Sequence, residues 1–114
     1  SLEAYLQLRI VVAALNEGWE PQFTKDEVRW YPWFWLYTQK ELDEMSVEEK
    51  RERRMMDVRG RVSEHYAGFG YAASSNAPSD ALAHFGSRLC LKSEELATYC
   101  GKQFIDLWSY FNLG

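Results

Sequence analysis

The stretch RWYPWFWLY at residues 29–37 holds six aromatic side chains in nine positions and decides how the rest of the chain must fold. Successive side chains of a strand point to opposite faces, so a strand from Val28 onward predicts two different surfaces. The even-numbered positions are all apolar, namely Val28, Trp30, Pro32, Phe34 and Leu36. The odd-numbered positions each carry a polar group on a large side chain, namely Arg29, Tyr31, Trp33, Trp35 and Tyr37. The pattern predicts one buried face and one face suited to water or a ligand.

Pro32 interrupts the backbone donors of this strand because proline has no N–H to give to a neighbour. The strand is therefore predicted to lie at the edge of its sheet or to carry a bulge, and a bulge would mix the two faces. Burial of the apolar face suffices to anchor the strand, at about 1.5 to 3 kcal/mol for each large apolar side chain. The odd-numbered face is then either covered, by the final helix or by a subunit partner, or left open as a binding surface.

Two amphipathic helices are predicted at the ends of the chain. The first ends at Gly18 in a left-handed conformation and carries two adjacent apolar stripes: Leu2, Leu6, Ile10 and Ala13, with Leu8, Val12 and Leu15 beside them. The last begins at the N-cap Ser93 and continues through the stripe Leu96, Cys100, Phe104, Leu107 and Phe111. Gly101 costs this helix up to about 1 kcal/mol relative to alanine, so we expect another backbone or ring to approach it closely. We expect the last helix to pack on the sheet.

Between these helices, the sequence indicates short elements. TQKE at residues 38–41 and SVEE at residues 46–49 each match a capping box, which predicts two short helices. The second should reach about Met56 and lie solvated, since it has almost no apolar stripe and pairs Glu49 with Arg53.

Residues 56–92 favour short strands. MDVRGRV (56–62), HYAGFGYAA (65–73) and HFGSRLCLK (84–92) are predicted strands, with SSNAPSD (74–80) as a loop. The predicted fold class is α+β, a small antiparallel sheet of short strands packed against an N-terminal and a C-terminal helix. One domain is expected over residues 1–114.

The composition limits the functional classes. A net charge of −4 argues against a general polyanion binder but allows a local basic groove. No apolar run approaches the ~18 residues of a membrane span, and the start lacks the pattern of a signal peptide. Two cysteines, Cys90 and Cys100, predict neither a disulfide framework nor a zinc site, and both should be buried thiols. We therefore expect a cytoplasmic protein without a membrane partner.

Catalytic chemistry has little support in the residue pattern. His65 and His84 lie at no ligand spacing to another histidine, cysteine or carboxylate pair. Gly68 and Gly70 lack the third glycine and the following helix of a phosphate-binding loop, so they are expected to let neighbouring rings lie across the backbone. We predict no catalytic residue, no metal ligand and no cofactor.

The basic residues are unevenly distributed. Six of the thirteen lie within twelve positions, namely Lys50, Arg51, Arg53, Arg54, Arg59 and Arg61. Because Glu48, Glu49 and Glu52 are interspersed, a solvated charged helix is the ordinary interpretation. The cluster nevertheless follows the aromatic strand closely in sequence.

Three segments carry a family resemblance. PWFWLYTQKELDEMSVEEK (32–50), GSRLCLKSEELATYCGKQFIDLWSYF (86–111) and ALNEGWEP (14–21) resemble an uncharacterised family of small proteins from phages and prophages of gut Bacteroidales. The match covers most of the chain, and residues 54–85 are the most variable part. Members usually carry a further N-terminal segment, so the resemblance implies one before Ser1. It implies a context inside the bacterial host cell and no mechanism.

Two functions are predicted from these features. The first is non-enzymatic binding of single-stranded DNA, with bases stacked on the aromatic face and arginines on the phosphates. Its residues are Arg29, Tyr31, Trp33, Trp35, Tyr37, Arg51, Arg53, Arg54, Arg59 and Arg61. The alternative is a protein-interaction module that self-associates or docks on a host or virion protein through the same face. Edge-strand pairing beside Pro32 would be one geometry for a homo-oligomer. An enzyme has the least support.

Overall fold

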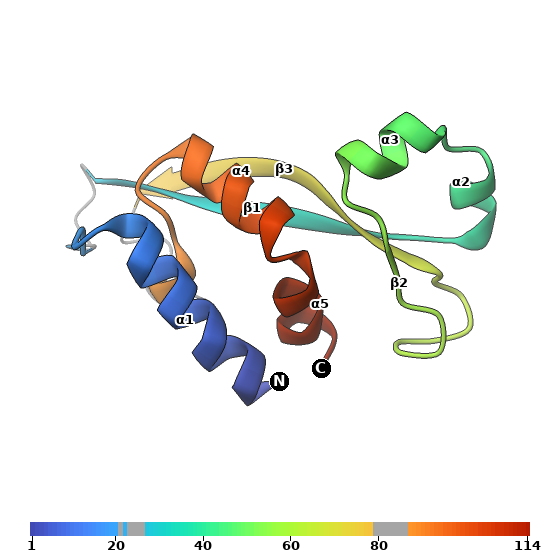
Figure 1. Cartoon of the computed structure of the whole chain (residues 1–114), viewed down its shortest axis with the longest axis horizontal. Helices are drawn as coiled ribbons and strands as arrows, with labels where there is room; N and C mark the ends of the chain where they lie inside the picture. Colours follow the sequence, from blue (N-terminus) through green and yellow to red (C-terminus); the bar gives the residue numbers. More distant parts are fainter. Residues whose placement is uncertain (21, 23–26, 79–86) are drawn as a thin grey trace.

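The computed structural model describes residues 1–20, 22, 27–78 and 87–114. It has helices at both ends of the chain and a three-stranded sheet between them (Figure 1). In chain order the elements are α1 (Leu2–Asn16), β1 (Val28–Tyr37), α2 (Gln39–Asp43), α3 (Val47–Glu52), β2 (Met56–Asp57), β3 (Gly68–Pro78), the 3-10 helix η2 (Ser87–Leu89), α4 (Glu94–Gln103) and α5 (Ile105–Leu113). The predicted α+β class, with an antiparallel sheet packed against N-terminal and C-terminal helices, is confirmed.

The sheet is antiparallel and its strand order is β1–β3–β2, so β1 lies at an edge, as predicted. The pairing of β1 with β3 also contains a bulge. Trp33 lies opposite Ala73, whereas the next residue, Phe34, lies opposite Tyr71. The extra residue, Ala72, belongs to β3, and the alternation of side chains along β1 is therefore unbroken.

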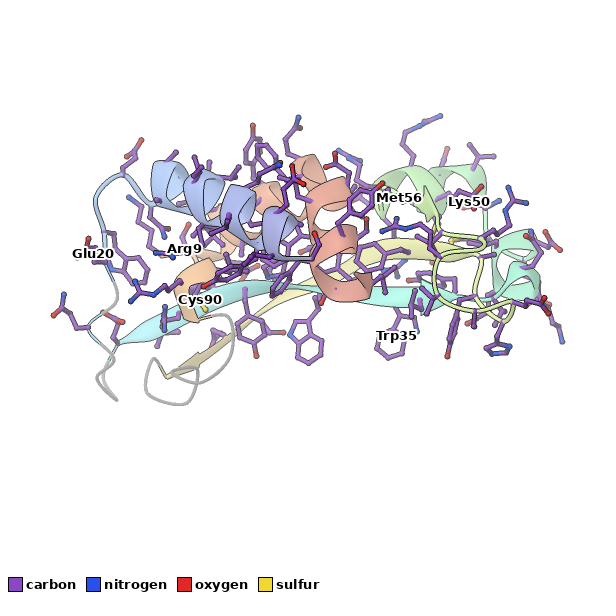
Figure 2. The ribbon with its side chains drawn as sticks, turned by 90° about the horizontal axis from the view of Figure 1, so that it is seen from below. Arg9, Glu20, Trp35, Lys50, Met56 and Cys90 are labelled. Atoms are coloured by element: carbon purple, nitrogen blue, oxygen red, sulfur yellow. The ribbon has the colours of Figure 1, made fainter. Side chains whose placement is uncertain are left out.

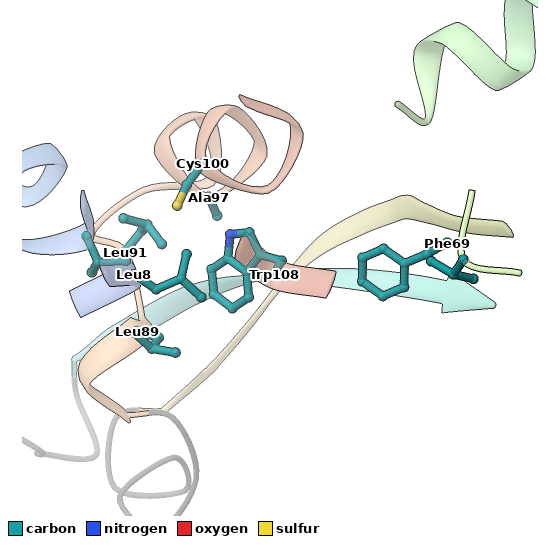
Figure 3. Packing of buried hydrophobic residues seen from close by; sticks show 9 residues of the cluster. Leu8, Phe69, Leu89, Leu91, Ala97, Cys100 and Trp108 are labelled. Atoms are coloured by element: carbon teal, nitrogen blue, oxygen red, sulfur yellow. The ribbon is translucent and has the colours of Figure 1, made fainter. Parts of the chain in front are cut away.

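The core lies between the helices and the even-numbered face of β1 (Figure 3). The ring of Phe34 lies 5.0 Å from that of Phe69 and 5.5 Å from that of Trp108, between ring centroids. Leu8 of α1 and Cys100 of α4 are fully buried in the same cluster. Three helices thus meet over one sheet face, and the predicted anchoring of β1 by its apolar side is confirmed.

α1 buries one of its two predicted apolar stripes. Its buried residues are Ala4, Leu8, Val12 and Asn16, and its exposed large apolar residues are Leu2, Leu6 and Ile10. Asn16 holds this orientation, because its side-chain amide donates to the carbonyl oxygen of Cys90 at 3.1 Å and accepts from the N–H of Lys92 at 3.1 Å. The helix ends with Glu17 (φ 49°) and Gly18 (φ 89°) both left-handed, and Gly18 was the predicted site.

The predicted last helix is two helices, so the expectation of one continuous helix through Phe111 is wrong. Ser93 caps α4 as predicted, because its hydroxyl accepts from the N–H of Leu96 at 3.2 Å. The backbone then leaves the helical region at Phe104, with φ −115° and ψ 34°, and α5 starts in a new direction (Figure 1).

Gly101 sets the distance between α4 and the sheet. A Cβ added there would lie 2.7 Å from the Cβ of Pro32 and 3.1 Å from the Cδ1 of Tyr71, so the predicted close approach is confirmed. Beside this contact, the hydroxyl of Tyr71 lies 2.8 Å from the Oγ of Ser74 and 3.1 Å from the Oγ1 of Thr98. The glycine allows α4 to lie close enough for these hydrogen bonds to form.

The two short helices are confirmed. Thr38 and Glu41 form a reciprocal capping box at the start of α2, and the Oγ of Ser46 accepts from the N–H of Glu49 at 3.1 Å at the start of α3. α3 lies solvated as predicted, but it ends before Met56. Both caps lie at the end of the sheet where β1 ends (Figure 1).

The predicted strands between residues 56 and 80 differ from the observed ones in length. Only Met56–Asp57 of the first predicted strand form β2, paired with Phe69 and Gly68. The second is β3, but it continues through residues 74–78, so the predicted loop is wrong there. Pairing with β1 overrides the low strand propensity of the serines and asparagine in this segment, as tertiary context often does.

The third predicted strand, over residues 84–92, is also wrong where the structure describes it. Ser87–Leu89 form η2, and Leu91 makes an isolated antiparallel bridge to Trp30. The start of that prediction, including His84, lies outside the described residues. Among the helices of the described chain, none has the length and apolar character to span a bilayer.

Candidate functional site

The middle of the odd-numbered face of β1 is open. Figure 2 shows Trp35 projecting from the side of the sheet away from α1 and α5. Trp33 and Trp35 are 48 % and 57 % exposed, which is large for tryptophan. Tyr31 is half-buried beside them, with its ring centroid 5.9 Å from that of Trp33. These three residues therefore form an accessible aromatic row at the predicted positions.

The two ends of the same face are closed, so the prediction that Arg29 and Tyr37 are available to a ligand is wrong. Their exposed fractions are 0 % and 8 %. Gly70 explains the packing at Tyr37, because a Cβ on this glycine would lie 3.3 Å from the tyrosine ring and 3.1 Å from the methyl group of Met55. Burial raises the pKa of Tyr37 and lowers the pKa of Arg29.

The predicted basic cluster is largely engaged within the fold. The Nε of Arg53 lies 3.3 Å from a carboxylate oxygen of Glu49, and its Nη1 donates to the carbonyl oxygen of Tyr71 at 3.2 Å. Arg59 is paired with Asp57 at 2.7 Å. Arg53 therefore joins α3 to β3, and the charge of Arg59 is neutralised locally.

Two more of these arginines have structural contacts. The guanidinium carbon of Arg61 lies 4.2 Å from the centroid of the Tyr110 ring, and its Nη1 donates to the Oγ of Ser109 at 3.2 Å. Arg54 donates to the carbonyl oxygen of Arg51 at 2.7 Å. Arg61 thus joins the segment after β2 to α5.

Three of the basic residues line one hollow near the end of β1. Lys50, Arg51 and Arg59 line a hollow of about 460 Å³ between α2, α3 and β2. The hollow also includes Met55, whose methyl group would lie 3.1 Å from a Cβ on Gly70, the residue opposite Trp35, so it adjoins the odd-numbered face at its Tyr37 end.

The outer edge of β1 is the most distinctive part of the site. The N–H and carbonyl oxygen of Trp30 pair with Leu91, at 2.9 and 2.7 Å, on the side away from β3. Backbone groups alternate in direction along a strand, so those of Pro32, Phe34 and Leu36 also point to this outer edge. Within the described ranges, no strand pairs with it beyond Trp30.

An apolar groove of about 660 Å³ follows this edge. Most of its lining residues come from β1, from α5 and from Leu89 and Cys90 just before Leu91. Among the residues that the structure describes, the groove is lined by uncharged side chains: Tyr31, Pro32, Trp33, Phe34, Trp35, Leu36, Phe69, Leu89, Cys90, Trp108, Phe111, Asn112 and Leu113. The groove could hold the apolar side chains of a strand that pairs with the backbone groups of Phe34 and Leu36.

The cysteines and His65 do not form a reactive centre. Both thiols are buried as predicted, and burial raises the pKa of Cys100 to about 11 and also raises the pKa of Cys90. His65 is exposed and its ring lies 4.7 Å from that of Tyr66. In the part of the chain that the structure describes, no group of three or more potential metal ligands converges.

Comparison of the chain with models of protein families, with curated proteins and with solved structures finds no match. The sequence places Phe111 on the apolar stripe of the last helix, but it does not reveal that Phe111 and Trp108 line the groove. The break at Phe104, which carries them to the edge of β1, has no proline or N-cap signal.

Proposed function

We propose that this chain is a protein-interaction module that binds an extended, uncharged segment of polypeptide as an additional strand on the outer edge of β1. The observation that carries the proposal is the open edge at Phe34 and Leu36 beside an apolar groove. Strand addition takes its affinity from main-chain hydrogen bonds and its specificity from pockets for alternate side chains. Both features are present on one side of β1.

The chemistry of the groove favours polypeptide as the partner. The chain has a net charge of −4, and the lining of the groove is uncharged. A charged group buried there would lose its hydration without gaining a partner. A strand with apolar side chains at alternate positions would fill the groove from one face and leave its other face beside Trp33 and Trp35. Tryptophan and tyrosine are enriched at the centres of such interfaces.

The test uses a short capped peptide that alternates leucine with threonine between terminal lysines. Hydrogen exchange of the Phe34 and Leu36 amides is followed by NMR at protein concentrations where the chain is monomeric. Binding should slow both amides, because each becomes a ladder donor. A peptide with proline in place of the central threonines is the control and should leave them fast. Unchanged exchange at millimolar peptide would refute the proposal.

Single-stranded DNA remains a second candidate, and one observation favours it. Trp33 and Trp35 expose about half of their surface in a row, and exposed aromatic rings stack bases at about 1 to 3 kcal/mol each. The test is a titration of labelled oligothymidine between about 50 and 200 mM salt. Binding that weakens with salt and is lost in Trp33→Ala with Trp35→Ala would support this candidate. Absence of binding at micromolar protein would remove it.

A further inference from the structure

We infer that the segment bound at this edge is β1 of a second copy of the chain, paired antiparallel about a twofold axis at Trp35. This inference rests on the proposed function and specifies its partner. It would join two three-stranded sheets into one continuous sheet, with both sets of helices on the same side.

The backbone groups at the outer edge allow one symmetric register in which every hydrogen-bonded pair forms both of its bonds. Pro32 has no N–H, and the N–H of Thr38 is already donated to Glu41 at 2.9 Å in the capping box. Pairing is thus limited to residues 33–37. A twofold axis at Trp35 places Phe34 opposite Leu36 of the second copy and the reverse, and each pair exchanges both of its hydrogen bonds. An axis at Phe34 would instead place Leu36 opposite proline and leave its carbonyl oxygen without a donor.

The side chains in this register match the two surfaces beside the edge. On the helix side, Leu36 of the second copy would lie next to Phe34 and enter the groove below Phe111 and Leu113. On the other side, Trp35 would face its own symmetry mate, in a pair whose side chains are the closest in an antiparallel ladder. The apolar side chains of β1 in each copy therefore fit the groove of the other copy. An isologous interface requires this self-complementarity.

Charge and area limit the affinity for a second copy. Two chains of net charge −4 repel each other, but the groove lining contributes no charge to the seam. The exposed halves of Trp33 and Trp35 amount to roughly 250 Å² for the pair. A standard interface takes about 800 Å² from each partner, so the groove and the rim of α5 must also be covered. We expect a dissociation constant on the order of micromolar.

Disulfide trapping tests the register. In an antiparallel pair without mutual hydrogen bonds the Cα atoms are about 4.5 Å apart, within the range of about 4.4 to 6.8 Å that a disulfide spans. Trp35→Cys should therefore form a covalent dimer under a mild oxidant. Trp33→Cys is the matched control, because the two copies of residue 33 would lie about 13 Å apart along the seam. The native thiols of Cys90 and Cys100 are buried. Equal trapping of both variants would overturn the register.

Substitution of Trp35 by charged residues tests the interface in solution. Trp35→Glu and Trp35→Lys should each raise the dissociation constant at least about tenfold in sedimentation velocity, because like charges would face each other at the axis. An equimolar mixture of the two should recover association as a heterodimer. Val47→Glu, at an apolar position 69 % exposed on α3, is the control for an added charge and should leave the dimer intact.

The outcomes separate the two proposals. A wild-type chain that stays monomeric at all concentrations but binds the leucine–threonine peptide at Phe34 and Leu36 would overturn the dimer and keep the interaction module. A dimer that Trp35→Glu leaves unchanged would overturn the β1 seam. Failure of both dimerisation and peptide binding would overturn the proposed function itself.

Discussion

Replacing Trp33 and Trp35 together by alanine distinguishes a surface from a core. Both rings are about half exposed, so their removal opens no cavity and loses only partial burial. At about 25 cal/mol for each Å² of apolar surface, and with roughly 60 Å² of buried ring lost at each site, the loss is about 1.5 kcal/mol per residue. The double variant should therefore lose about 3 kcal/mol and remain folded.

Replacing Trp30 and Phe34 by alanine is the matched control on the other face of the same strand. Phe34 is packed against Phe69 and Trp108 at 5.0 and 5.5 Å, and Trp30 packs against the same core. Core phenylalanine or tryptophan to alanine costs about 3 to 5 kcal/mol because a cavity remains. The control variant should thus lose about 6 kcal/mol or more, which is comparable with the whole stability of a small domain.

Thermal denaturation at low protein concentration compares the two double variants without a contribution from association. At roughly 4 °C for each kcal/mol in a domain of this size, the Trp33 and Trp35 variant should melt about 12 °C below the parent. The Trp30 and Phe34 variant should melt at least about twice as far below it or fail to fold. Equal losses would show that the exposed face is structural, and both proposals would lose their main support.

Three further predictions concern packing and titration. Gly101→Ala should lower the free energy of unfolding measured in urea by about 1 to 3 kcal/mol despite its better helix propensity, because the new methyl group would meet Pro32; an unchanged free energy of unfolding would contradict the contact. Cys100, whose pKa burial raises to about 11, should resist iodoacetamide at pH 8 in the native chain and react after unfolding. Asp57 should titrate in NMR with a pKa of about 2, because Arg59 hydrogen-bonds its carboxylate, and Arg59→Ala should return that pKa towards 3.8. Since the folded pKa is depressed, the stabilisation from this pair is present above pH 3.8 and is lost as the pH falls through about 2.

Local signals predicted those parts of the fold that depend on neighbours in sequence. The capping box of Thr38 and Glu41 and the N-cap Ser93 are specified by residues three or four positions apart. The alternation of β1 was also predicted from its own residues. It survived because the bulge placed its extra residue, Ala72, in β3. A bulge in β1 between Trp33 and Phe34 would instead have turned the residues from Phe34 onward to the opposite face of the sheet.

Features that depend on distant contacts were beyond sequence reasoning. The inner stripe of α1 was left open, because Leu2 and Leu8 are equally apolar; the contact of Asn16 with the strand segment at Cys90 chooses between them. The burial of Arg29 likewise depends on what packs over the end of β1, whereas its charge predicted a surface position.

The basic cluster shows a related limit. Its density in sequence suggested a phosphate-binding surface, but pairing with Glu49, Asp57 and Tyr110 uses three of its arginines to hold α3, the segment after β2 and α5 in place. Whether an arginine is available to a ligand depends on which acceptors the fold brings to it. A sequence shows the charges and not their partners.

Among the described residues, few features protect the outer edge of β1 beyond Trp30. Proteins usually guard an exposed edge strand with lysine, with an inward-facing charge, with proline or with a covering element. Here Pro32 and the capping box at Thr38 bound the edge at its two ends, and the five residues between them are all apolar or aromatic. Such an edge would promote unspecific aggregation if it stayed bare at cellular concentrations. A bounded edge with a shaped groove instead admits one short strand in one register, so the absence of guarding charges and the presence of the groove are explained together by a strand that binds there.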